Sequence, residues 1–206
     1  MSNVIKPGSR EFESEASQII AMLPAGPRLA VIGSTTCHHK DTEKICNSVG
    51  RGLAGIDGLI LLTGGVSGVG EMVGKSFYSA RTGAGHRGVF HILPHGHSAW
   101  DYGQTLFGGA DMAERRQILG RLAERYLVIE GGPGTAHEGS IAMARSVLLV
   151  PVGRCGGYAG DVYPQLHRPL FIKPEDWQVL GDSRRTAEQV ADAVTEIIRL
   201  HLGIAP

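Results

Sequence analysis

Residues 130–138 read EGGPGTAHE and form the segment best suited to chemistry in this chain of 206 residues. A helix is predicted to begin here, and small residues let an anion approach the N–H groups at a helix N-terminus. Glu138 follows within the first turn and a half, so its carboxylate faces the same pocket unless it only complements the helix dipole. The pattern favours an anion bound beside a general acid–base group. The residues predicted to hold the anion are Gly131, Gly132, Gly134 and Thr135.

Two further loops of small residues follow strand-like apolar runs. Gly33 and Ser34 open the first, which is either a phosphate-binding wall or an ordinary turn. The second, TGGVSGVG over residues 63–70, resembles a dinucleotide fingerprint, but the next strand ends in ILPH without the ribose-binding carboxylate. It also lacks the Gly-Lys-Ser/Thr ending of a P-loop, so an NAD-dependent oxidoreductase is disfavoured. Its predicted binding residues are Gly64, Gly65, Ser67 and Gly68.

A charged stretch, DMAERR over residues 111–116, precedes the 130–138 segment. Asp111 and Arg115 are one helical turn apart, so they could pair on one face of a helix. Taken alone, this stretch is better interpreted as a solvated charged face of a helix.

Short apolar runs alternate with segments of helical periodicity along the chain. This alternation predicts βαβ units and a parallel sheet covered on both faces. We therefore predict an α/β fold, an open, doubly wound, Rossmann-like parallel sheet in a single domain over residues 1–206, with ligands bound at the carboxyl ends of the strands. Asp41 is a predicted helix N-cap, and residues 153–160 and 167–182 are interpreted as loops. The predicted strands cover residues 29–32, 59–62, 89–93, 126–129 and 147–152, and the predicted helices lie within 12–23, 45–53, 72–80, 112–122 and 190–198.

The composition disfavours several classes of protein. Twenty Lys and Arg residues balance 20 Asp and Glu residues, so neither nucleic-acid binding through bulk charge nor a polybasic membrane anchor is expected. There is no apolar run of transmembrane length, and residues 1–18 lack the apolar stretch of a signal peptide. Cys37, Cys46 and Cys155 lack metal-type spacing, and so few cysteines favour a reducing compartment. A cytoplasmic protein is the prediction.

Two groups of side chains allow more than one interpretation. His91, His95 and His97 lie at a strand end, where imidazoles can bind a metal ion, but no carboxylate or cysteine lies close by in the sequence. We expect no metal and interpret them as hydrogen-bonded loop residues or direct ligand contacts. A nearby aromatic group either stacks on a nucleobase or covers the sheet edge or a subunit contact. Its members are Trp100, Tyr102 and Phe107.

The pairing of residues 111–116 with residues 130–138, which begin 15 residues after Arg115, resembles the signature of the Lonely Guy (LOG) family. The family pattern is Asp-Met-His-x-Arg-Lys followed by Pro-Gly-Gly-x-Gly-Thr-x-x-Glu. Residues 63–68 resemble the second glycine loop of the same superfamily, and the resemblance covers about residues 29–152. These proteins, once labelled lysine decarboxylase-like, are cytokinin riboside 5′-monophosphate phosphoribohydrolases.

The resemblance implies a Rossmann-like enzyme that hydrolyses the N-glycosidic bond of a nucleoside 5′-monophosphate to a base and ribose 5-phosphate. It further implies a small-molecule nucleotide as ligand, no cofactor, and a homodimer or higher homo-oligomer. Arg115 and Glu138 match the catalytic arginine and glutamate of the family. The positions that match its phosphate loop and pocket walls are Gly131, Gly132, Gly134, Thr135, Gly33, Ser34 and residues 64–68.

Four positions depart from the family pattern. Glu130 replaces the proline that opens the motif, Ala113 replaces a histidine, Arg116 replaces a lysine, and His137 stands where an acidic residue is common. A carboxylate at Glu130 would repel a nearby phosphate unless an Arg or Lys neutralises it. The alternative function is therefore a non-catalytic nucleotide-binding sensor or carrier of the same superfamily. Release of a free base separates the two hypotheses.

Overall fold

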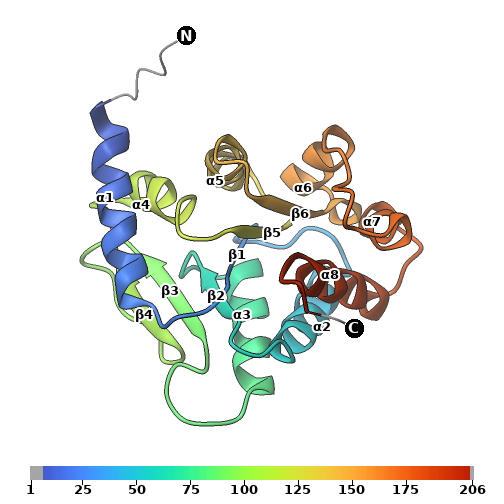
Figure 1. Ribbon diagram of the computed structural model, residues 1–206, viewed down its shortest axis with the longest axis horizontal. Coiled ribbons are helices and arrows are strands. Elements are labelled where there is room, and N and C mark those ends of the chain that lie inside the picture. The colour runs from blue at the N-terminus through green and yellow to red at the C-terminus, as the bar shows by residue number, and fades with distance from the viewer. Residues whose placement is uncertain (1–6, 205–206) are drawn as a thin grey trace.

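The computed structural model describes residues 7–204 and contains a six-stranded sheet in the order β4-β3-β2-β1-β5-β6 (Figure 1). Every strand pair is parallel. The order reverses beside β1, which places a topological switch point between β1 and β5. The predicted open, doubly wound α/β sheet is confirmed. Its strands are β1 (Arg28–Gly33), β2 (Ile60–Thr63), β3 (Val89–Leu93), β4 (Gln104–Phe107), β5 (Arg125–Ile129) and β6 (Leu148–Val152).

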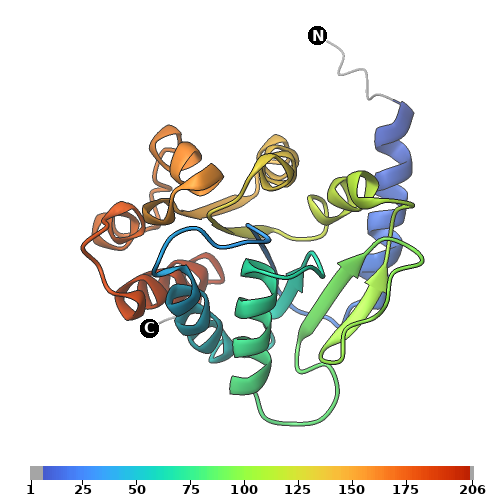
Figure 2. The same ribbon diagram turned by 180° about the vertical axis from the view of Figure 1, so that it is seen from behind.

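Helices cover both faces of the sheet, and each face has its own apolar core (Figure 2). Two cores arise because successive side chains of a strand point to opposite faces. One face carries α2 (Thr42–Ala54), α3 (Val69–Ala80), α7 (Pro174–Gly181) and α8 (Ala187–His201). The other carries α1 (Pro7–Met22), α4 (Met112–Leu119), α5 (Pro133–Ala144) and α6 (Gly157–Val162), and the short 3₁₀ turns η1 (Gly153–Cys155) and η2 (Tyr163–Gln165) flank α6.

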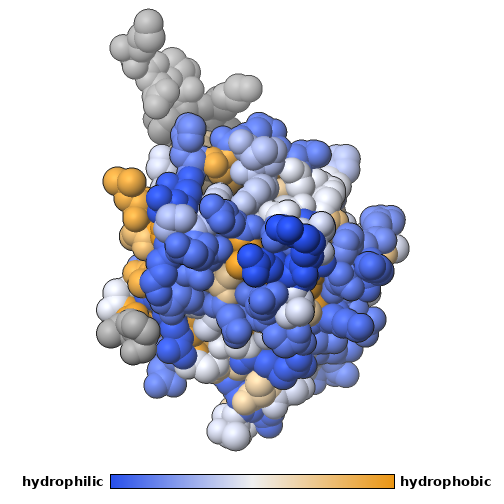
Figure 3. All heavy atoms as spheres, turned by 90° about the vertical axis from the view of Figure 1, so that its right-hand side faces the viewer, coloured by the Kyte–Doolittle hydropathy of each residue, from blue (hydrophilic) through white to orange (hydrophobic). Residues whose placement is uncertain are grey.

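Burial explains why the five predicted strands could be recognised. Strands β2, β3, β5 and β6 are buried at every position, so their sequences are continuous apolar runs. The helices instead bury one stripe and expose the rest. The side of the molecule that carries α6, α7 and α8 is accordingly mostly hydrophilic, with apolar residues gathered along one margin (Figure 3).

The structure corrects three of the sequence predictions. Strand β4 was not predicted, because only Leu106 of its four residues is buried at this edge of the sheet. The segments interpreted as loops contain α6 and α7, and α7 buries Trp177 and Leu180 against the core. Asp41 occupies the N-cap position of α2 but makes no capping hydrogen bond, because its Oδ2 pairs with Arg154 Nη2 at 2.7 Å.

The described part of the chain runs from the start of α1 to the residues just after α8. Residues 1–6 of the segment predicted to lack a signal peptide lie outside the described residues. Helix α8 ends at His201, and Gly203 follows with a φ of +68°, the conformation expected just after a helix C-terminus. Across residues 7–204, none of the helices combines the length and the apolar character needed to cross a membrane.

Candidate functional site

A cavity of about 450 Å³ opens at the carboxyl ends of β1, β2 and β5, beside the switch point. Ligands of open α/β sheets bind at this position because the loops diverge there. The loops after these three strands form its walls together with α4. The predicted site residues that line it are Gly33, Ser34, Gly64, Ser67, Arg115, Gly132, Gly134, Thr135 and Glu138.

Three predicted binding glycines lie behind the wall, where they set the backbone path. Gly65, Gly68 and Gly131 have φ values of +61°, +96° and +107°, which side chains rarely allow. A Cβ atom on Gly131 would lie 2.6 Å from Thr135 Cβ, and one on Gly68 would lie 2.3 Å from the carbonyl oxygen of Ser34. These glycines therefore allow the loops to pack together and are not part of the cavity lining.

Gly68→Ala should destabilise the protein and loosen the cavity. Its backbone conformation favours glycine, and the added methyl group would press on the β1 loop, so we expect a loss on the order of 1–3 kcal/mol in the free energy of unfolding. Urea denaturation measures this loss. Gly83→Ala is the matched control, because Gly83 has a φ of +107° but a Cβ atom added there would meet nothing within 4 Å. Equal losses for both variants would show that the β1 loop is not under pressure.

Arg115 and Glu138 form a buried ion pair in the cavity wall. Arg115 Nη1 lies 2.5 Å from Glu138 Oε1, and the side chains are only 3% and 8% exposed. Arg115 Nη2 also approaches Met112 Sδ at 3.8 Å. Arg115 Nε is buried and has no hydrogen-bond partner among the described residues. The ion pair with Glu138 is therefore the main polar contact of the Arg115 side chain.

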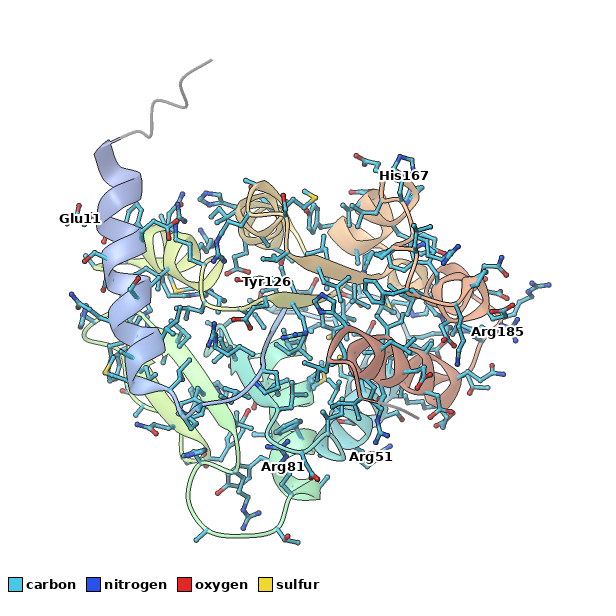
Figure 4. All side chains as sticks on the ribbon, in the orientation of Figure 1. Glu11, Arg51, Arg81, Tyr126, His167 and Arg185 are labelled. Carbon is cyan, nitrogen blue, oxygen red and sulfur yellow. The ribbon has the colours of Figure 1, made fainter. Side chains whose placement is uncertain are left out.

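Helix α4 is fixed at both ends, which aims Arg115 at Glu138. Asp111 is its N-cap and accepts from the backbone N–H groups of Ala113 and Glu114 at 2.8 and 2.9 Å. At the other end, the hydroxyl of Tyr126, in the centre of the molecule, donates to Leu119 O at 2.9 Å (Figure 4). Asp111 and Arg115 therefore do not pair, because the Asp111 carboxylate serves as a cap, and Arg115 is buried, which a solvated charged face does not describe.

Burial shifts both members of the Arg115–Glu138 pair toward their neutral forms. It raises the pKa of Glu138, a shift that Arg115 and Arg116 oppose, and it lowers the pKa of Arg115, a shift that Glu138 opposes. A guanidinium nevertheless stays protonated in proteins. Because its pKa is raised, the Glu138 carboxyl group takes up a proton more readily than an exposed glutamate does.

The N-terminus of α5 faces the cavity through Gly132, Pro133, Gly134 and Thr135. Pro133 occupies the first turn, where its fixed φ suits a helix start and its missing N–H leaves no donor unpaired. The first N–H groups of a helix have no intrahelical acceptor. The backbone N–H groups of Gly134 and Thr135 can therefore bind an anion in the cavity.

Direct hydrogen bonds join the loops after β1 and β5. Thr135 Oγ1 donates to Gly33 O at 3.1 Å, and the N–H of Gly131 donates to Ser34 Oγ at 2.9 Å. The predicted phosphate loop and the first predicted pocket wall thus form one continuous surface.

The Glu130 carboxylate is bound by the segment that leads into α2. It accepts from the N–H of His39 at 2.9 Å, from the N–H of His38 at 3.1 Å and from the Thr42 hydroxyl. Burial alone would raise its pKa, but these donors and Ser34 outweigh burial, so the pKa is lowered. Among the described residues no Arg or Lys forms a salt bridge with this carboxylate, and uncharged donors stabilise it, so its negative charge is not neutralised.

The aromatic group packs against the sheet edge and does not line the cavity. Trp100 Nε1 donates to Gly65 O at 2.8 Å, and the Tyr102 hydroxyl donates to Glu71 O at 3.3 Å. Phe107 lies in β4 and stacks near His95. Of the two alternatives, the structure supports cover of the sheet edge.

The strand-end histidines have separate surroundings. His91 is buried, with its ring nitrogens 2.8 Å from Thr63 Oγ1 and 3.0 Å from Tyr102 O. His95 Nε2 lies 3.7 Å from Glu15 Oε1, and His97 is exposed. In the part of the chain that the structure describes, no three His, Cys, Asp or Glu side chains are grouped as a metal site requires.

The family model for SLOG cluster4 matches residues 27–168, which include all three loops and the Arg115–Glu138 pair. The chain belongs to the SLOG cluster4 family. This confirms the predicted membership of the LOG-type superfamily. No curated protein matches the SLOG cluster4 chain.

Solved structures confirm the Rossmann-like fold of this SLOG cluster4 protein. TM1055, a structural genomics target, is 24% identical with a TM-score of 0.61 over 82% of this chain and 99% of its own. The molybdenum cofactor carrier protein of Chlamydomonas reinhardtii is 25% identical with a TM-score of 0.51 over 61% and 75%. The molybdenum cofactor binding protein of Rippkaea orientalis is 20% identical with a TM-score of 0.57 over 85% and 99%.

Several cavity residues of the SLOG cluster4 protein were not among the predicted site residues. Arg116 is the most consequential, because a Cβ atom on Gly134 would lie only 3.0 Å from Arg116 Nε, which puts a cation at the α5 N-terminus. Its position directly after Arg115 in the sequence was the signal that could have identified it as a site residue. The others include Thr35, Thr36, His38, Val66, Gly70, Met112 and Leu119.

Proposed function

We propose that this SLOG cluster4 protein hydrolyses the N-glycosidic bond of a nucleoside 5′-monophosphate. The observation that carries the proposal is the buried Arg115–Glu138 pair, which meets at 2.5 Å in the wall of an open cavity. Burying two charges is expensive even when they pair, so such a pair is weak support for stability. Perturbed, paired groups in a cleft are typical of functional sites.

The 5′-phosphate would bind at the N-terminus of α5. The N–H groups of Gly134 and Thr135 donate to it, and the Arg116 guanidinium, which borders Gly134, supplies positive charge. The hydroxyl group of Ser67 lies on the opposite loop. This placement puts the ribose between the phosphate and the Arg115–Glu138 pair.

Glu138 and Arg115 would then divide the chemistry. The reaction passes through an oxocarbenium-like sugar, whose positive charge a carboxylate stabilises. A water oxygen bonds to C1′ as the C1′–N bond breaks, and the electron pair of that bond leaves with the base. Glu138 accepts the water proton and then passes it to the departing base nitrogen, so the products are a neutral base and ribose 5-phosphate and the carboxylate is regenerated. Arg115 stabilises the charge that develops on the base.

Chromatography of a nucleotide panel tests the proposal: AMP, GMP, IMP, CMP, UMP and isopentenyl-AMP are incubated with the protein. We expect free base from at least one nucleotide and a rate lower by about 100-fold or more for Glu138→Gln, because an amide cannot accept the proton. Gln keeps the size of Glu and still accepts from Arg115, so the fold is retained.

Glu175→Gln, an exposed substitution on α7, is the control and should match the wild type. Undiminished base release by Glu138→Gln would overturn the catalytic assignment.

A second candidate is a carrier or sensor that binds a nucleotide-derived ligand without cleaving it. The 25% identity to the molybdenum cofactor carrier protein of Chlamydomonas reinhardtii favours it. In that case the panel gives a rise in Tm without free base, and Glu138→Gln leaves the affinity nearly unchanged.

We also infer a reducing compartment, such as the cytoplasm, for this activity. Cys37, Cys46 and Cys155 are free thiols. Burial raises the pKa of Cys46, and it raises that of Cys155 to about 11, so both stay protonated and unreactive. The homodimer stays a prediction taken from the LOG resemblance.

A further inference from the structure

Three hydrogen-bond donors at the start of α2 converge on one buried carboxylate. The N–H groups of His38 and His39 and the hydroxyl of Thr42 all donate to Glu130, whose residue is only 2% exposed. Successive backbone N–H groups joined by a hydroxyl are a typical way of binding a phosphate or another anion. Here the chain itself supplies the anion.

This group of donors adjoins the cavity. His38 lines the cavity, as do Thr35 and Thr36 on the same segment. Next to Glu130, the N–H of Gly131 donates to Ser34 Oγ, so the acceptor and the donors belong to the joined loops after β1 and β5, both of which line the cavity. A ligand that carried a second anionic group toward α2 would have to displace the carboxylate and would meet its negative charge.

The backbone at Glu130 indicates that the side chain has a role of its own. Its φ is +53°, in the left-handed region that residues other than glycine adopt rarely. Glycine would fit this turn without strain, yet the sequence has a glutamate there. Among the described residues no Arg, Lys or His forms a salt bridge with it. Strained residues of this kind gather at functional sites.

We propose that Glu130 restricts the cavity to ligands with a single anionic group by filling a second anion-binding position with its own carboxylate. The inference rests on the proposed function, because it takes the first anionic group to be the 5′-phosphate at α5. It predicts that a nucleoside monophosphate binds and that the corresponding diphosphate is rejected.

Glu130→Gly is the decisive variant, because glycine accepts the backbone conformation and leaves the three donors free. Isothermal titration calorimetry compares matched pairs: AMP with ADP, GMP with GDP, and inorganic phosphate with pyrophosphate. The wild type should prefer the member with one anionic group. In Glu130→Gly the ratio of diphosphate to monophosphate affinity should rise about tenfold or more, because charge-assisted hydrogen bonds replace repulsion.

Glu43→Gln is the charge-matched control, since Glu43 is exposed on α2 and its removal leaves the donors occupied. It should keep the wild-type ratio. Equal ratios in the wild type, Glu130→Gly and Glu43→Gln would overturn the inference.

If Glu130→Gly does not fold, Glu130→Gln decides: a ratio above that of Glu43→Gln supports the inference, and an equal ratio overturns it. If no nucleotide binds the wild type, the proposed function fails. In that case the inference is supported if Glu130→Gly gains affinity for pyrophosphate relative to phosphate, and it is overturned if the variant does not.

Discussion

Arg115→Met should lower the free energy of unfolding by about 3–5 kcal/mol, the loss expected when one partner of a buried ion pair is removed. The Glu138 carboxylate would remain buried without the guanidinium that meets it at 2.5 Å. Its pKa, already raised by burial, would rise further, because Arg115 is the largest influence that lowers it. Urea denaturation at pH 7 measures the loss.

The double variant Arg115→Met with Glu138→Leu completes the test. Replacing a buried ion pair by apolar residues of similar size is often neutral or stabilising, so most of the lost stability should return while base release stays absent. Lys75→Met is the control, because the Lys75–Glu71 pair is largely exposed and such pairs contribute little to stability. If Arg115→Met costs no more than Lys75→Met, the cavity pair is solvated and its proposed role in catalysis loses its support.

A second large effect is expected on acidification, through His91. Burial lowers the pKa of this imidazole to about 4 from an ordinary value of 6.5. Tyr102 O can only accept, so His91 Nε2 carries the proton and Nδ1 accepts from the Thr63 hydroxyl. Thr63 Oγ1 in turn accepts from the N–H of Gly65, which connects the neutral ring to the loop after β2.

The sign of the effect follows from where the proton binds. Unfolded His91 takes up a proton below about pH 6.5 and folded His91 only near pH 4, so its contribution is complete above pH 6.5 and is lost as the pH falls toward 4. At about 1.4 kcal/mol per pKa unit, the loss by pH 4 is about 3 kcal/mol. Urea denaturation from pH 7.5 to 4 should show a shallower decline for His91→Gln, which can still accept and donate.

His97→Gln, at an exposed position on the same loop, controls for the loss of one histidine. Parallel stability curves for the wild type and His91→Gln would contradict a neutral buried ring.

The central sheet was predictable because strands buried on both faces have continuous apolar runs in the sequence. Strand β4 was not, since most of its residues are at least partly exposed at the sheet edge. Helix α7 was not, because it buries only Trp177 and Leu180 and carries no long periodic stripe. A local sequence pattern reflects the burial of its own segment. Strand β4 and helix α7 depend instead on contacts with neighbouring elements, which such a pattern does not record.

The site could be predicted at the level of its loops but not of its contacts. Glycine and threonine at a strand-to-helix turn indicate an anion site. Many of the cavity-lining residues between Gly33 and Glu138 could be predicted from this pattern. Whether Asp111 caps a helix or pairs with Arg115 depends on geometry across 23 residues of chain, because Arg115 finds Glu138 instead. The partners of Glu130 lie some 90 residues away and leave no local signal.

The hydrogen bonds between the β1 and β5 loops constrain the order of events during synthesis. They join residues 91 to 102 positions apart, and the segment between β1 and β5 contains α2, β2, α3, β3, β4 and α4. Closing so long a segment is entropically costly and slow. A nascent chain that stops before residue 138 therefore lacks the Arg115–Glu138 pair. Ligand cannot assist the early steps of folding and can stabilise only the nearly finished chain.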